Sequence, residues 1–185
     1  MGFLNSSEIN KYITGDLFKN KLSSLDIPIS NECLEYTSDV IEVGKEETYS
    51  PQSYEFERID LAPKETKFIK LKDLIKMDVE HVGLIFPRYS YTLLGLTIPP
   101  IVIQSGFSGE LFISITNNHI NKTIQGIYPG MKLVQFMIST LNPGADSYSD
   151  LDSSKYVNAQ TLKGSRAFSD DEINSIIASF EKANG

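Results

Sequence analysis

Short apolar runs, separated by clusters of Gly, Pro, Asn and Ser, fill the middle of this chain. Most runs are rich in the β-branched and aromatic residues typical of strands. They predict strands at residues 40–43, 54–60, 66–71, 82–86, 101–103, 110–116 and 133–140. Many short strands with frequent turn signals are typical of a small barrel or jelly roll, so we expect a mainly β fold.

Two short helices are expected to flank these strands. Asn5 and Glu8 have the spacing of a capping box and predict a helix at about residues 5–14. Ser169 and Glu172 repeat that spacing and predict a second helix at about residues 170–182. Its apolar stripe, which we expect to pack against the β core or a neighbouring subunit, comprises Ile173, Ile176, Ile177 and Phe180.

Gln135 is the polar exception in a strand that is otherwise apolar on both faces. A polar side chain in such a strand needs a hydrogen-bonding partner. Two interpretations stay open for this amide: it binds a ligand, or it makes a structural hydrogen bond.

Composition narrows the class of protein. A chain of 185 residues with 41% apolar residues is enough for one domain, so we expect residues 1–185 to form a single unit. Its net charge of −7 argues against nucleic acid as a partner, because binding a phosphate backbone requires a basic surface. An anionic ligand would instead need a few focused cations.

Metal, membrane and secretory signals are missing from the sequence. His81 and His119 do not have metal-ligand spacing, and the zinc deaminase pattern is absent, so we expect no zinc. The longest apolar stretch, residues 93–103, is too short to span a bilayer and contains two prolines. Cys33 has no partner for a disulfide, and no secretory segment opens the chain. We therefore expect a cytoplasmic protein without membrane contact.

Three blocks carry a family resemblance: FPRYSYTLLGL (86–96), QSGFSGELFISITNN (104–118) and YPGMKLVQ (128–135). In order and approximate spacing they resemble the core of the dCTP deaminase and trimeric dUTPase superfamily. The resemblance implies a distorted β-barrel or jelly roll of the dUTPase-like type. It also implies a homotrimer with nucleotide sites between subunits, and a magnesium ion that accompanies a bound triphosphate.

The resemblance implies candidate phosphate ligands. Arg88 and Ser90 match the family's first block, and on an extended segment their side chains would point the same way and could share one phosphate. Gln135 matches the family amide that meets phosphates. The segment KYVNAQTLKGSR (155–166) resembles the family's closing segment, so Lys155 and Arg166 are further candidates, with solvated surface cations as the alternative.

The sugar and base would meet a different set of residues. The resemblance assigns this role to Gln104, Gly106 and Tyr156, together with the 97–105 connection. Gly106 and Gly109 suit a tight turn of positive φ, which a hairpin without any ligand would also explain.

The positions that move protons in the family are replaced. The family aspartate falls on Gln104, the proton-shuttling glutamate on Ser114, the second arginine on Leu93 and a closing-segment glutamine on Ala159. A serine without an adjacent base cannot replace a carboxylate, and general acid–base catalysis contributes roughly 10²–10⁴-fold. Glu110, the nearest alternative, would lie about 13 Å from Ser114 along the strand. We therefore expect no catalytic residue at the family positions.

These observations favour a nucleotide-binding protein that senses, sequesters or regulates through a deoxyribonucleoside triphosphate or related nucleotide, without the family's catalysis. Two alternatives stay open. One is an active, divergent dCTP deaminase or dUTPase, and the other is a structural or protein-interaction module that has lost its nucleotide.

Overall fold

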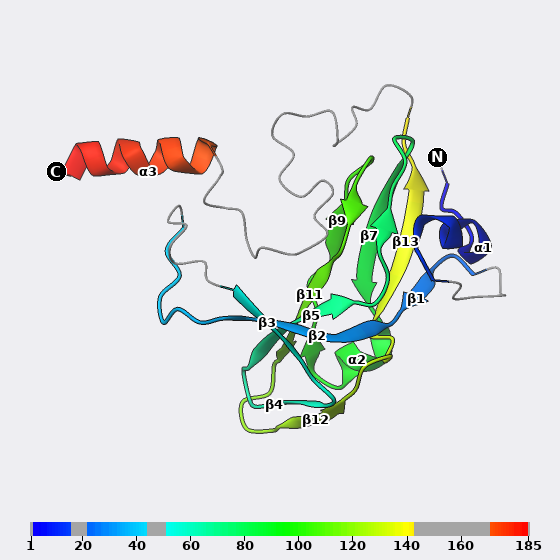
Figure 1. Cartoon of the computed structure of the whole chain (residues 1–185), viewed down its shortest axis with the longest axis horizontal. Coiled ribbons are helices and arrows are strands. Elements are labelled where there is room, and N and C mark those ends of the chain that lie inside the picture. The colour runs from blue at the N-terminus through cyan, green and yellow to red at the C-terminus, as the bar shows by residue number, and fades with distance from the viewer. Residues whose placement is uncertain (1, 16–21, 44–50, 143–170, 185) are drawn as a thin grey trace.

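The computed structural model describes residues 2–15, 22–43, 51–142 and 171–184, and short antiparallel strands dominate it (Figure 1). Its helical elements are α1 (Ser6–Ile9), the 3₁₀ turn η1 (Asn10–Tyr12), α2 (Tyr89–Leu93) and α3 (Asp171–Asn184). The strands are β1 (Leu25–Ile27), β2 (Ile29–Tyr36), β3 (Pro51–Glu55), β4 (Ile59–Leu61), β5 (Thr66–Leu71), β6 (Ile75–Lys76), β7 (His81–Pro87), β8 (Leu96–Thr97), β9 (Ile101–Ile103), β10 (Ser108–Gly109), β11 (Phe112–Asn117), β12 (Ile124–Ile127) and β13 (Val134–Thr140).

Two larger sheets share one hydrophobic core. One has the order β1-β13-β7-β9 and the other β3-β2-β5-β11-β8, while β10-β6 and β12-β4 form two-stranded ribbons. The chain changes sheet at Pro28, between β1 and β2. Buried side chains from both sheets belong to one cluster, for example Ile85 and Phe136 from the first and Ile69 and Ile113 from the second. The expected mainly β, jelly-roll-like fold is confirmed, and the described sheets stay separate without closing into one barrel.

Strand β13 lies between β1 and β7 and sets the register of the first sheet. Val134, Phe136 and Ile138 are buried, whereas Gln135 and Met137 are half-buried on the opposite face. This alternation is the pattern of a strand with one face on the core. Gln135 is thereby held outside the core.

The N-terminal capping box is confirmed. The Asn5 side chain accepts hydrogen bonds from the backbone N–H groups of Ser7 and Glu8, and the Glu8 carboxylate accepts from the Asn5 backbone N–H at 2.9 Å. The helix is shorter than expected, because α1 continues only as η1 to Tyr12. The apolar side of this segment is nevertheless buried, with Ile9 at 0% and Tyr12 at 3% exposure.

Several predicted elements are wrong. Residues 40–43 form no strand, and Val40 is 68% exposed, because apolar character alone supplies no pairing partner. Residues 54–60 are split between β3 and β4 instead of forming one strand. The sequence pattern also missed β2, whose interior carries Ser30, Asn31 and Glu32.

The C-terminal helix forms close to its predicted bounds, as α3. Figure 1 shows it apart from the sheets, and Ile176 is 52% exposed. The expected packing of its apolar stripe against the β core is therefore not seen among the described residues. The residues of its predicted cap, Ser169 and Glu172, lie outside those whose side chains are described.

Asn117 closes β11 and is completely buried. Its Nδ2 donates to the carbonyl oxygens of Leu61, Ala62 and Lys122 at 2.9, 3.1 and 2.7 Å, and its Oδ1 accepts from the His119 N–H at 3.0 Å. One side chain thus ties β4 and two loops to the end of the second sheet.

Replacing this amide should be costly. We expect Asn117→Ala to lower the free energy of unfolding by about 2–4 kcal/mol, because it leaves buried carbonyl groups without donors. Asn118→Ala is the matched control: among the described residues its exposed side-chain amide bonds the Thr97 hydroxyl alone, and its loss should cost less than about 1 kcal/mol. Urea unfolding measures both, and equal losses would contradict the assignment.

Candidate functional site

Arg88 lies where β7 ends and α2 begins. Its backbone N–H donates to the Leu133 carbonyl at 2.9 Å, and its Nη1 donates to the Lys132 carbonyl at 3.1 Å. Its Nε lies 3.4 Å from Asp26 Oδ2, and the Arg88 side chain is 37% exposed. The guanidinium is therefore held between Lys132, just before β13, and Asp26 of β1, while part of the side chain stays open to an anionic ligand.

Gln135 lies in the same region. It pairs with Asp26 of β1 on one side and with Phe86 of β7 on the other. Ser24 Oγ donates to Gln135 Oε1 at 3.2 Å, which orients the amide. In the described part of the chain no acceptor is bound to Nε2. The NH₂ group can thus donate to a ligand such as a phosphate oxygen.

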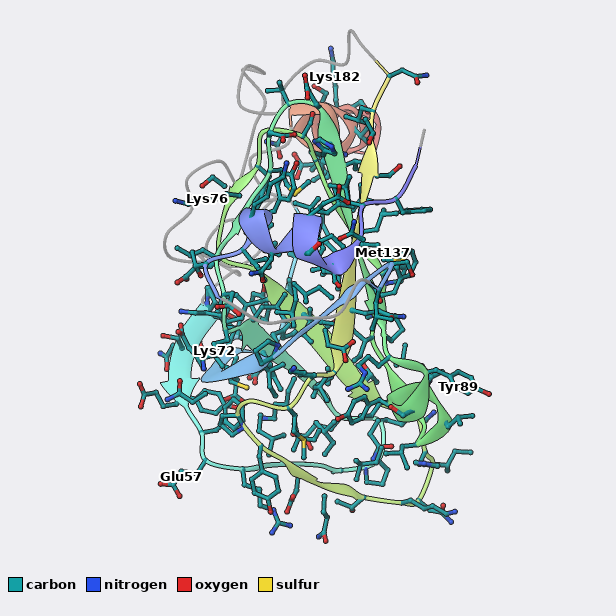
Figure 2. All side chains as sticks on the ribbon, turned by 90° about the vertical axis from the view of Figure 1, so that its right-hand side faces the viewer. Glu57, Lys72, Lys76, Tyr89, Met137 and Lys182 are labelled. Carbon is teal, nitrogen blue, oxygen red and sulfur yellow. The ribbon has the colours of Figure 1, made fainter. Side chains whose placement is uncertain are left out.

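Ser90 is not on an extended segment, and that expectation was wrong. Residues 89–93 form α2, with Arg88 as its N-cap, so Arg88 and Ser90 lie at the first turn of a helix. The helix closes because the Tyr91 N–H donates to the Arg88 carbonyl at 3.0 Å. Tyr89, labelled in Figure 2, projects from α2 away from the sheets and is 74% exposed. Ser90 is also exposed, and no hydrogen bond among the described residues joins it to Arg88 or Gln135.

Gln104 begins a tight turn after β9. Its carbonyl accepts from the Phe107 N–H at 3.2 Å, and Gly106 has φ of 77°, which the third position of a type II turn requires. The Gln104 residue itself is exposed. The positive φ expected of Gly106 is confirmed. The expectation for Gly109 was wrong, because this residue lies in β10, paired with Ile75.

The turn of the third block is also formed. The Met131 N–H donates to the Tyr128 carbonyl at 3.2 Å, closing a turn over Pro129 and Gly130. The Gly130 N–H donates to the Ile29 carbonyl at 2.9 Å, and the Met131 carbonyl accepts from the Ile29 N–H at the same distance. This turn fixes the start of the segment that leads to Gln135.

Ser114 lies on the second sheet, on the face opposite the core. It is half-buried and pairs with Phe68 of β5. No carboxylate among the described residues is hydrogen-bonded to it. Leu93, at the position of the family's second arginine, is 68% exposed. The described residues therefore place no acid or base at the positions where the resemblance expects proton transfer.

Glu110 is not part of β11, contrary to the prediction, because the strand begins at Phe112. Its carboxylate lies 2.9 Å from Lys70 Nζ, and the same ammonium lies 2.7 Å from Glu32. Burial alone would lower the pKa of Lys70, but hydrogen bonds and charges from Glu32 and Glu110 raise it. Both carboxylates are thus engaged by a lysine that stays charged.

The remaining candidates lie outside the described residues, namely Lys155, Tyr156, Ala159 and Arg166. Within the described part of the chain, no group of three or more His, Cys, Asp or Glu side chains is placed to hold a metal ion. None of the helices described there has the length and apolarity that crossing a bilayer requires.

Sequence reasoning missed Ser24, Asp26 and Lys70, which hold Gln135, Arg88 and Glu110 respectively. The apolar–polar–apolar pattern of Leu25, Asp26 and Ile27 is a strand signal too short to detect alone. Nothing in the local sequence identifies their partners.

A family model, curated relatives and solved structures all show similarity of this chain to dCTP deaminases. The family described as dCTP deaminase-like matches residues 5–141. A dCTP deaminase of Ignicoccus hospitalis is 31% identical over 134 residues, covering 69% of this chain and 73% of the relative. A dCTP deaminase of Pyrobaculum arsenaticum is 25% identical over 133 residues, covering 70% and 74%. Among solved structures, the 2'-deoxycytidine 5'-triphosphate deaminase of Agrobacterium tumefaciens superposes with a TM-score of 0.60 at 13% identity, covering 76% of this chain and 48% of that chain. This last similarity concerns the fold alone.

The amide of Gln135 should matter little for stability. We expect Gln135→Leu to change the free energy of unfolding by less than about 1 kcal/mol, because only one neutral hydrogen bond is lost. Ser24→Ala removes the same bond from its other side and should have an effect of similar size. Chemical denaturation tests both, and a loss above about 2 kcal/mol for Gln135→Leu would mark the amide as structural.

Proposed function

Because the chain belongs to the dCTP deaminase-like family, we propose that it binds a deoxyribonucleoside triphosphate or related nucleotide without turning it over. Nucleotide binding is supported by the Gln135 amide, which Ser24 orients, and by the Arg88 guanidinium, which contacts Asp26, the strand partner of Gln135. An oriented NH₂ group and a half-open guanidinium are a suitable pair of donors for phosphate oxygens. A few such donors can act although the whole chain carries a net charge of −7.

The argument against catalysis concerns Ser114, which lies on the second sheet. A deaminase without a metal needs a group that takes a proton from water and delivers it to the leaving ammonia. No carboxylate among the described residues is hydrogen-bonded to Ser114, and Gln104 can orient a water but cannot hold its proton. The carboxylates of Glu32 and Glu110 are ion-paired with Lys70. The site therefore favours binding over turnover.

The rest of the ligand would be held by residues already assigned from the resemblance. Ser90, Lys155 and Arg166 would complete the phosphate site, and Gln104, Gly106 and Tyr156 would meet the base and sugar. A magnesium ion would accompany the triphosphate as its counterion, with no zinc involved. The lone Cys33, which is buried, fits a single-domain protein in the reducing cytoplasm.

Assembly as a homotrimer is part of the same proposal. The outer face of the first sheet offers an apolar contact surface: Val102, Leu84 and Met137 lie in one row across β9, β7 and β13. Val102 is 58% and the neighbouring Phe86 36% exposed. Met137 is labelled in Figure 2. A second copy covering this face would bury these side chains close to Gln135.

A divergent enzyme is the second candidate, since the relatives at 31% and 25% identity are named dCTP deaminases. In that case a displaced carboxylate such as Glu110 would have to act, and it would first have to leave Lys70.

Nucleotide binding should appear as stabilisation of the folded protein. We expect dCTP, dUTP or a related triphosphate at 100 times its dissociation constant to add about 2.7 kcal/mol. A thermal-shift panel measures this, and Arg88→Leu and Gln135→Leu should remove the shift while remaining folded. If no nucleotide stabilises the protein at millimolar concentration, a structural or protein-interaction role replaces the proposal.

Turnover should be absent. Incubation of the purified protein with dCTP or dUTP is expected to release no ammonia, dUMP or pyrophosphate, because no carboxylate of the described residues is hydrogen-bonded to Ser114. Should turnover be seen, Glu110→Gln tests the displaced carboxylate, with Glu55→Gln on exposed β3 as the matched control. Turnover lost only in Glu110→Gln would favour the divergent enzyme.

A charged residue introduced on the apolar outer face of the first sheet tests the proposed trimer. We expect Met137→Glu to convert the trimer to a smaller, folded species in analytical ultracentrifugation, because burying a carboxylate in an apolar contact is costly. Ile120→Glu, at a side chain that is 84% exposed, should leave the trimer intact. A monomeric parent protein would contradict the proposed assembly.

A further inference from the structure

A cluster of three titratable side chains, Tyr12, Asp78 and His81, lies outside the proposed phosphate site. The Tyr12 hydroxyl donates to Asp78 Oδ2 at 2.7 Å, and His81 Nδ1 donates to Asp78 Oδ1 at the same distance. His81 Nδ1 also lies 3.0 Å from the Tyr12 hydroxyl. Tyr12 is 3% and His81 8% exposed, whereas the Asp78 side chain that both contact is 44% exposed, so the hydrogen bonds to Asp78 are part-buried.

The protonation states suit this arrangement at neutral pH. Burial, the hydrogen bond to Asp78 and the charges of Asp78, Glu80 and Glu8 raise the pKa of Tyr12, which stays a donor. Burial alone would raise the pKa of Asp78, but hydrogen bonds from His81, Tyr12 and the Glu80 backbone lower it. The Asp78 carboxylate thus accepts hydrogen bonds from Tyr12, His81 and the Glu80 backbone N–H.

The backbone of the same segment supports the Gln104–Phe107 turn. The Asp78 carbonyl accepts from the Gly106 N–H at 3.0 Å, and the Met77 N–H donates to the Phe107 carbonyl at 2.7 Å. The turn therefore rests on residues 77–78 through two backbone hydrogen bonds.

The N-terminal segment supports residues 73–78 from the other side. Ile13 forms a bridge with Ile75, and Ile75 pairs with Gly109, just after the turn. The Thr14 N–H donates to the Leu74 carbonyl at 3.2 Å. Three segments far apart in sequence thus lie in order: residues 12–14, then 73–78, then 104–109.

We propose that Tyr12, with His81, is a positioning residue that holds Asp78 and, through the Asp78 carbonyl, the turn that carries Gln104. Neither side chain needs to touch the ligand. Three donors fix the Asp78 side chain, which restricts the direction of its carbonyl and keeps the Gly106 N–H bound. The inference rests on the proposed function, because only the family resemblance gives this turn a nucleotide to bind.

Amide hydrogen exchange tests the positioning without any ligand. In Tyr12→Phe, which keeps the ring and removes only the hydroxyl, we expect the Gly106 and Met77 amides to exchange about tenfold faster, as the loss of a hydrogen bond to a charged group implies. Tyr128→Phe is the matched control, because its hydroxyl contacts Arg58 at the β4–β12 ribbon. Unchanged exchange at Gly106 in Tyr12→Phe would overturn the proposal. Equal acceleration in the β4–β12 ribbon would also overturn it, since that indicates only lower global stability.

Rescue by a conservative variant separates positioning from packing. His81→Asn keeps an N–H donor near the place of Nδ1 and should retain most of the protection at Gly106, whereas His81→Leu fills the space without a donor and should lose it. Equal protection in both variants would contradict a role for the hydrogen bond.

The affinity for a nucleotide tests whether Tyr12 affects the proposed binding site. If dCTP or dUTP stabilises the parent protein, Tyr12→Phe should weaken that nucleotide about tenfold, and an unchanged affinity would contradict the link to the site. If neither nucleotide binds the parent protein while Gly106 exchange still accelerates in Tyr12→Phe, the proposed function fails and the positioning of the turn stands.

Discussion

The pairing of β13 with β1 and β7 is the constraint on which the rest of the molecule depends. Residues 134–140 pair with 87–81, and residues 134–136 pair with 27–25. Because side chains alternate along a strand, this register buries Phe136 and leaves Gln135 beside Asp26. A slip of one residue would bury the amide and expose the core side chains. The Arg88 N–H extends the same ladder to Leu133, so the pairing that builds the core also assembles the candidate phosphate site.

The candidate phosphate donors and the position that the resemblance assigns to proton transfer lie on different sheets. Gln135 and the β7 residues that lead to Arg88 belong to the first sheet, whereas Ser114 belongs to the second. The residue at position 114 can therefore differ without changing the strand pairing around Gln135. Under the proposed function, this separation would let the phosphate donors persist while the residue at position 114 differs.

Local pattern predicted some elements well and others badly. Strand β9 is a run of β-branched residues and β5 is rich in apolar and β-branched residues, and both strands form where expected. Strand β2 was missed because polar residues interrupt it, and its pairing with β3 and β5 compensates for weak local preference. The segment of Arg88 and Ser90 was expected to be extended within the block that carries the family resemblance, yet residues 89–93 close into α2. For β2, tertiary pairing outweighed local propensity, whereas α2 closes through local hydrogen bonds such as that from the Tyr91 N–H to the Arg88 carbonyl.

By itself, the sequence determined the strand-rich class, the Asn5 capping box, the Gly106 turn and the isolation of Gln135 in an apolar strand. These features depend on neighbours within a few residues, so composition and spacing are enough to reveal them. Tertiary structure alone decided that Ser24 meets Gln135 across 111 residues, that Tyr12 meets Asp78 across 66, and that Lys70 holds Glu110. Such contacts follow from strand register and from which segments pack together, and no local pattern of residues encodes them.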